Sequence, residues 1–409
     1  MKLLLHDFAG HPFPAHLARA LARRGIEVDH AFCAGVASGR GDLARRAGDP
    51  GSLRFTALSE QPFERYAPLR RLASELRYGS RLARHVVRSR PDAVLSGNTP
   101  LLAQMLLWAA AGHVGARRAY WVQDFLGRGT RDVLSARSRL LGATLGAALE
   151  GLETRLLRRS DAAVVISDDF VSELERRSVD VPVTVIENWA PLDEIPVEPK
   201  DNAWARSHGL QQRPVALYSG TLGLKHDPDH LLAVARALRG TDAALVVVTE
   251  GRGRQHLEAA RAREDLEGTL VLLDYVDYET FPQLLGAADV CLVLLEAGAG
   301  TFSVPSKVLA YLAAGRPIAA AVPGANLAAR IIERAGAGTV TEPGDHQAFV
   351  DSVATLLQDG ERRAAGGRSA RAYAEATFDI EVISARVAEV LAAGPPAPLS
   401  ELEAPHGTI

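Results

Sequence analysis

Short apolar runs alternate with longer amphipathic stretches along most of the chain. The runs have strand length and contain β-branched residues, whereas the stretches between them carry apolar positions at helical spacing. Strands that alternate with helices of ten or more residues predict right-handed crossovers and a parallel, doubly wound α/β sheet. The expected strands are residues 2–5, 93–96, 119–122, 162–166, 183–186, 215–218, 244–248, 269–273, 290–294, 317–321 and 338–340.

The alternation pauses at residues 191–213, where prolines and mixed charges replace the periodic pattern, and we expect a linker there. This division predicts two Rossmann-like domains, at 1–190 and 214–376. A last amphipathic helix at 377–393 is expected to pack back on the N-terminal domain, and the tail at 394–409 to be disordered. Because ligands bind outside the carboxyl ends of such sheets, the two domains would face each other across a ligand-binding cleft.

The composition fits this reading and excludes some classes of protein. A length of 409 residues with 47% hydrophobic and 23% charged residues suits a soluble two-domain protein. The net charge of -3 argues against nucleic-acid binding, which usually needs a basic domain. Cys33 and Cys291 lie far apart in or beside apolar runs and are expected to be buried thiols. No apolar stretch reaches the ~20 residues that span a bilayer, so a cytoplasmic location is expected.

Lysine is rare in this chain and is therefore informative. The 46 basic residues include only four lysines, Lys2, Lys200, Lys225 and Lys307. Lys225 closes a turn after the strand at 215–218, and the glycines of that turn, Gly220 and Gly223, would let the backbone approach a ligand closely. A compact ammonium beside such a turn suits phosphate, and we predict a diphosphate site.

A second candidate phosphate site follows the strand at 290–294. The backbone just before the next helix would lie at the positive end of the helix dipole, which is a ready anion site formed by Ser303, Val304, Pro305 and Ser306. Lys307 in the first helical turn opposes the dipole unless an anion compensates it. The alternative is a flexible loop in which a serine caps the helix and Lys307 is solvated.

Other turns at strand ends are candidates to line the site. Gly10 lies between the first strand and a helix that starts with prolines, where the alternative is a plain turn. Glu250 and Gly251 follow the strand at 244–248, and the carboxylate could hold a ribose hydroxyl or simply be solvated. Asp124 ends another strand and is the carboxylate expected to point at a reacting sugar, with a helix N-cap as the alternative.

Taken together, the turn at 220–225, the sequence SVPSK at 303–307 and the sequence YLAAGRPI at 311–318 resemble the family-four glycosyltransferases, which are retaining enzymes of the GT-B fold. The resemblance covers nearly the whole chain, since GHPFPAHLARALARRGIEV, VVIS, VIENW and AADVCLVLL also look like family motifs in the expected order. The loop is similar to that of bacterial branches that build exopolysaccharide or other surface glycans.

The resemblance implies roles for individual residues. Gly10 would lie near the acceptor and the donor phosphate. Lys225 would contact the diphosphate, and residues 303–307 would lie beneath the phosphates. Glu250 and Val276 would lie near the nucleoside. The chain also departs from the family pattern. Thr221 stands where an arginine is usual, Gln123 and Asp124 stand where a histidine is usual, and Phe302 and Ala310 replace a pair of glutamates. The donor sugar therefore stays open.

The mechanism implied is a front-face displacement with retention, in which the departing β-phosphate oxygen accepts the acceptor's proton. Lys225 and Lys307 would stabilise the charge that develops on the leaving diphosphate. No protein nucleophile, metal ion or cofactor is expected beyond the nucleotide-sugar donor, for which UDP is favoured.

Residues 65–90 predict a basic amphipathic helix that could lie on an anionic membrane surface and so meet a lipid-linked glycan acceptor. Its arginines are Arg65, Arg70, Arg71, Arg77, Arg81, Arg84, Arg88 and Arg90. If this is only a solvated helix face, a soluble acceptor such as a natural-product aglycone is favoured. Two rivals stay open: an enzyme like the UDP-N-acetylglucosamine epimerase, and a catalytically degenerate GT-B binding partner.

Overall fold

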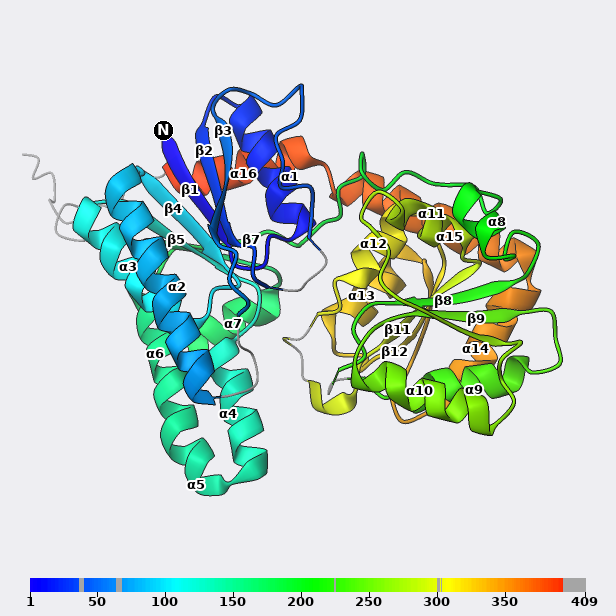
Figure 1. Cartoon of the computed structure of the whole chain (residues 1–409). Helices are drawn as coiled ribbons and strands as arrows, with labels where there is room; N and C mark the ends of the chain where they lie inside the picture. The colour runs from blue at the N-terminus through cyan, green and yellow to red at the C-terminus, as the bar shows by residue number, and fades with distance from the viewer. Residues whose placement is uncertain (37–39, 64–67, 224–225, 300–301, 303, 393–409) are drawn as a thin grey trace, which may run out of the picture. The chain divides into compact units, whose positions relative to one another are not determined.

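The computed structural model describes residues 1–36, 40–63, 68–223, 226–299, 302 and 304–392. They form two compact units (Figure 1). The first contains the described residues within Met1–Ser38, Leu43–Ile186 and Ile380–Ile409, and the second contains those within Gly39–Asp42 and Glu187–Asp379. Each unit has its own parallel sheet.

The first unit is built on strands in the order β3-β2-β1-β4-β5-β6-β7, and every pairing is parallel. The strands are β1 (Lys2–Asp7), β2 (Glu27–Cys33), β3 (Leu53–Ser59), β4 (Ala93–Gly97), β5 (Arg117–Val122), β6 (Ala162–Val165) and β7 (Val183–Val185). The helices are α1 (Pro12–Arg23), α2 (Pro68–Ser89), α3 (Leu101–Val114), α4 (Leu126–Arg137), α5 (Arg139–Leu141), a π-helical turn (Gly142–Gly146), α6 (Ala147–Arg158), α7 (Asp168–Arg176) and α16 (Ile380–Ala392).

The second unit has the strand order β10-β9-β8-β11-β12-β13, again with parallel pairing. Its strands are β8 (Val215–Ser219), β9 (Ala244–Val248), β10 (Leu270–Leu273), β11 (Val290–Leu294), β12 (Ile318–Ala321) and β13 (Gly338–Thr341). Its helices are α8 (Ala203–Ser207), α9 (Asp229–Leu238), α10 (Arg252–Arg263), α11 (Phe281–Ala287), a 3-10 turn (Ala297–Ala299), α12 (Lys307–Ala313), α13 (Leu327–Ala335), α14 (His346–Gln358) and α15 (Gly360–Thr377).

The predicted strands and the doubly wound fold are confirmed, but β2 and β3 were not predicted. Asp29 and His30 are buried in β2 and break its apolar pattern. Asp29 accepts hydrogen bonds from Thr56 and His85 at 2.6 and 2.8 Å, and His30 packs against the ring of Phe55. Because these two buried polar residues interrupt it, β2 lacks the continuous apolar run by which a strand buried on both faces is recognised in a sequence.

The segment expected as a linker packs within the second unit. Asn202 caps α8 and donates hydrogen bonds to the carbonyls of Pro199 and Gln283, both at 2.9 Å. These bonds tie the segment to α11. In the first unit, α16 packs on α1, and Arg24 donates to Ser384 Oγ at 2.8 Å. The tail at 394–409 lies outside the described residues.

The buried core of each unit combines the apolar side chains of its strands with those of the helices packed on them. Cys33 and Cys291 are both buried free thiols, as predicted. Across the described ranges, no helix combines the length and the apolar character needed to cross a membrane.

Candidate active site

The turn after β8 brings a glycine and a lysine from two separate candidate motifs together. Gly220 has a φ of 133°, a backbone conformation that residues with a side chain rarely adopt, and its N–H donates to the carbonyl of Val248 at 3.0 Å. A Cβ atom at this position would stand only 3.1 Å from Nζ of Lys307. The absence of a side chain at Gly220 therefore leaves the space that the ammonium occupies.

Lys307 is the first residue of α12, as predicted, and its Nζ is buried. Within the described part of the chain, this Nζ makes no hydrogen bond. It lies 3.5 Å from the centre of the Tyr218 ring, and burial lowers the pKa of the ammonium to about 7. A buried cation without a hydrogen-bonding partner is costly, and an anionic ligand would remove that cost.

Two tyrosines hold the lysine in place, and sequence reasoning missed both. The hydroxyl of Tyr311 accepts a hydrogen bond from Ser219 N at 3.1 Å and so fixes α12 to the end of β8. The hydroxyl of Tyr218 donates to the Thr221 carbonyl at 2.9 Å. Burial raises the pKa of both phenols, so they stay neutral. The four-residue spacing of Lys307 and Tyr311 on one helix face was the available signal.

The other candidates around this turn are only partly described. Thr221 is exposed, and its hydroxyl lies 3.2 Å from that of Tyr275 in the loop after β10. The segment before α12 is described for Val304, Pro305 and Ser306, and the carbonyls of Pro305 and Ser306 accept from the first turn of that helix. Lys225 and Ser303 lie outside the described residues, so their roles stay predictions.

Glu250, Gly251 and Val276 follow β9 and β10, whose carboxyl ends lie on the same sheet edge as that of β8. Glu250 is exposed, and Gly251 has a φ of 82° at the start of α10. Val276 is half-buried. Parallel strands place these turns side by side, although no contact of theirs identifies a ligand.

The turn at Gly10 in the first unit contains a polar cluster that the sequence did not reveal. Asp7 ends β1 and is buried, and it accepts hydrogen bonds from the backbone N–H of His11 at 2.6 Å and from Asn98 Nδ2 at 3.1 Å. The His11 ring nitrogen Nδ1 lies 3.0 Å from the same carboxylate. Gly10 has a φ of 73°, and a Cβ there would stand 2.6 Å from the Leu43 side chain.

Asp7 and His11 stabilise each other's charged forms. Burial alone would raise the pKa of Asp7, but the charge and the hydrogen bonds of His11 lower it below its ordinary value. Burial would likewise lower the pKa of His11, and the Asp7 carboxylate raises it instead. The result is a hydrogen-bonded pair of carboxylate and imidazole at the carboxyl end of β1, on the edge where ligands bind in sheets of this kind.

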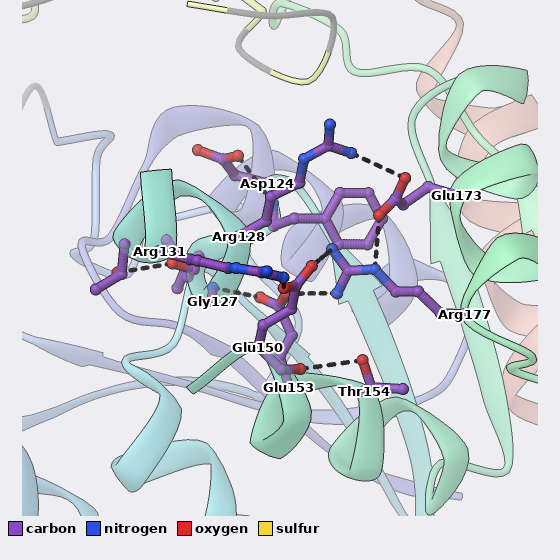
Figure 2. A network of polar contacts seen from close by, with 12 residues as sticks. Asp124, Gly127, Arg128, Arg131, Glu150, Glu153, Thr154, Glu173 and Arg177 are labelled. Carbon is purple, nitrogen blue, oxygen red and sulfur yellow. Dashed lines mark hydrogen bonds and ion pairs between the residues drawn. The ribbon is translucent and has the colours of Figure 1, made fainter. Parts of the chain in front are cut away.

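Asp124 follows β5 and lies at the margin of a network of charged side chains (Figure 2). One of its oxygens accepts a hydrogen bond from the backbone N–H of Phe125 at 2.8 Å, just before α4. Burial raises the pKa of Glu153, and the nearby Asp124 charge adds to this shift, against the opposing effect of Gly127 N–H and Arg177. The role of Asp124 toward a sugar stays a prediction.

The network itself joins three helices. Arg177, just after α7, donates to Glu153 of α6 at 2.8 Å and to Glu173 of α7 at 2.7 Å. Glu153 also accepts from Gly127 N in α4 at 3.0 Å. Because these partners are buried or nearly so, the network fixes the start of α4 and hence the position of Asp124.

Comparison with known proteins links both units to sugar transfer. Residues 11–189 match the model for a "Glycosyl transferase 4-like domain", and residues 200–373 match that for "Glycosyl transferases group 1". The two matches together cover most of the chain.

Individual relatives are more distant. Alpha-D-kanosaminyltransferase of Streptomyces kanamyceticus is 23% identical over 58% of this chain, and the match spans 62% of that protein's length. The "Probable glycosyltransferase WbjE" of Pseudomonas aeruginosa is 27% identical over 65% of this chain and 67% of its own. Anabaena HepE, solved in complex with UDP-glucose, has a TM-score of 0.68 at 17% identity and covers 96% of this chain and 99% of HepE.

Proposed function

The chain belongs to the family-four glycosyltransferases of the GT-B fold, and from this premise we propose that it transfers a sugar from a UDP-sugar to a lipid-linked or other glycan acceptor, with retention, in surface-glycan synthesis. The buried ammonium of Lys307, held against Gly220 at the end of β8, is the observation that carries the donor side of this proposal. Its surroundings suit the diphosphate of a nucleotide-sugar.

In the proposed mechanism the lysine acts on the leaving group. As the bond between the sugar and the diphosphate breaks, negative charge grows on the β-phosphate. A positioned ammonium in a dry site stabilises this charge without needing to reorganise. The departing oxygen accepts the proton of the attacking hydroxyl on the same face of the sugar, which gives retention without a protein nucleophile. The proposed reaction uses no metal ion.

The choice of UDP is supported by HepE, which binds UDP-glucose and shares the fold. It can be tested with a thermal-shift panel of UDP, GDP, dTDP, ADP and CMP, measured without added metal. A ligand that binds the native state raises Tm by mass action. We expect a selective rise with UDP that is lost in Lys307→Met and kept in Lys2→Met, a control at a half-buried lysine of the first unit. A rise of equal size in both variants would remove Lys307 from the donor site.

The proposed lipid-linked acceptor is supported by two surfaces of the first unit. In α2, Leu82 and Val86 are buried in the core, whereas Leu72 and Leu76 are exposed beside arginines. The acid of this helix, Glu75, is buried and pairs with Arg71 at 3.0 Å. Exposed leucines among cations favour an anionic lipid surface.

The second surface is the end of a helical arm. Figure 1 shows α4, α5 and α6 extending from the sheet of the first unit. Three leucines at α5 and the π-helical turn are exposed: Leu140 at 71%, Leu141 at 44% and Leu145 at 51%. Apolar side chains grouped at such a tip are suited to a membrane interface.

Vesicle flotation tests this acceptor side directly. The protein should float with vesicles that contain phosphatidylglycerol and much less with neutral phosphatidylcholine vesicles, and Leu140→Ser with Leu72→Ser should reduce flotation. The similarity to a kanosaminyltransferase favours a second candidate, transfer to a soluble natural-product aglycone. That candidate predicts no flotation with either vesicle and sugar transfer to soluble acceptors. Anomeric NMR of the product tests retention in both cases.

A further inference from the structure

A group of one carboxylate and two histidines lies in the second unit, outside the donor-site residues. Asp227 precedes α9, His230 is in the first turn of α9, and His346 is the first residue of α14. Their ligand atoms all lie within 4.8 Å of one another. The two helices pack together, although their residues lie far apart in the sequence.

The side chains have the geometry of metal ligands. One oxygen of Asp227, Oδ1, accepts a hydrogen bond from Asp229 N at 2.9 Å. The other, Oδ2, lies 3.5 Å from His230 Nδ1 and 3.3 Å from His346 Nε2. These separations are longer than the usual 2.7–3.2 Å of N–H···O bonds. Zinc bonds of about 2.0–2.1 Å in a tetrahedron place neighbouring ligand atoms about 3.3–3.4 Å apart. The two separations from Asp227 are close to this value, and the nitrogens of the two histidines lie within 4.8 Å of each other.

The two histidines lie close to each other and to the carboxylate. The His230 side chain is 2% exposed, and backbone groups of Asp227 and Pro343 lie within hydrogen-bonding reach of its ring. The ring of His346 lies 3.9 Å from that of His230, centre to centre, so the two imidazoles converge on the same carboxylate.

The chemistry of the donor atoms indicates the kind of ion. Two imidazoles and one carboxylate form a donor set that suits zinc and its first-row neighbours.

We propose that Asp227, His230 and His346 bind a divalent transition-metal ion of the zinc class. Three protein ligands leave a fourth position for water. The ion would cross-link the start of α9 to the start of α14 and so anchor the downstream end of the turn that follows β8. Its role is structural, and the site stands independently of the proposed donor chemistry.

The test uses the full chain without an affinity tag, first treated with a chelator. Zinc binding is measured by competition with a chromogenic chelator, and Tm is measured with and without zinc. The expected result is one zinc per chain and a raised Tm. Asp227→Asn and His346→Ala should each weaken zinc affinity by at least about tenfold. His256→Ala is the matched control, because His256 pairs with Asp229 beside the site but is not a ligand.

Cobalt gives a readout that two histidines packed together without a metal ion would not produce. The wild-type chain with Co²⁺ should show the visible absorption of a tetrahedral site, and His346→Ala should lose it. Absence of zinc binding, or equal affinity in wild type, His346→Ala and His256→Ala, would overturn the proposal and leave the two histidines as a packed pair. The UDP-dependent shift in Tm is measured on the same samples, so failure of the donor site is seen separately.

Discussion

The buried ammonium of Lys307 should lower the free energy of unfolding of the ligand-free protein, and UDP binding should restore it. The pKa of Lys307 falls from 10.5 to about 7 because the ammonium is buried. At 1.36 kcal/mol per unit, the shift corresponds to roughly 5 kcal/mol against the charged form. About 4 kcal/mol of this acts at pH 7, where about half of the folded molecules have already lost the proton. This is an upper bound, because movement of the side chain toward solvent would recover part of it.

The sign of the pH dependence follows from the direction of the shift. The folded pKa lies below the unfolded pKa, so the unfolded chain binds more protons between about pH 7 and pH 10.5. The contribution of Lys307 to the free energy of unfolding therefore rises with pH across this window. Lys307→Met should be more stable than wild type at pH 7, and the difference should shrink as the pH rises. Urea unfolding at several pH values measures it.

UDP should reverse the pKa shift and draw a proton onto the protein. At about pH 8 the diphosphate is fully ionised, since phosphate monoesters have a second pKa near 6, whereas about nine-tenths of the Lys307 side chains are neutral. Calorimetric titration in two buffers of different ionisation enthalpy should show an uptake of close to one proton for each UDP bound. Lys307→Met should show none, and Lys2→Met should match wild type. Zero uptake by the wild-type chain would refute the reasoning.

Three further predictions concern other parts of the site. Gly220→Ala should weaken UDP binding at least about tenfold, because its Cβ would stand 3.1 Å from the ammonium. Gly268→Ala, just before β10 and away from the turn, places its Cβ within 4 Å of no described atom and should bind UDP normally in the same titration. The raised pKa of His11 adds stability that is complete below pH 6.5 and is lost as the pH rises through the pKa of His11 in the folded protein. In a pH series, Tm should therefore decline less steeply in His11→Asn than in wild type. Glu153→Gln should lower the free energy of unfolding by roughly 3 kcal/mol in urea, since it breaks a buried pair with Arg177, and an unchanged midpoint would show the network to be dispensable.

Most of the fold could be read from the sequence, because parallel strands buried on both faces are continuous apolar runs. Residues 244–248 form such a run and are β9. The exceptions are β2 and β3. In β2, the buried Asp29 is hydrogen-bonded to His85 from α2, a partner that no local pattern reveals. Neighbours across a sheet or on a distant helix decide whether a polar residue can be buried.

The residues of the candidate site could likewise be predicted, but the contacts between them could not. Gly220 and Lys307 could be singled out because a turn and a helix start have local signatures. That the Lys307 side chain occupies the space left open at Gly220 depends on how β8 and α12 pack, which the sequence does not state. The pairing of Asp7 with Asn98 likewise requires β1 and β4 to be neighbours.

The path of the chain also bears on its synthesis. The first unit is completed by α16, which packs on α1 and whose Val390 carbonyl accepts a hydrogen bond from Arg117 at 3.1 Å. All of residues 187–379 are therefore translated before this helix leaves the ribosome. The second unit can finish folding while the first still exposes the apolar face that α16 covers. A nascent chain stalled in this interval would be a natural client for chaperones.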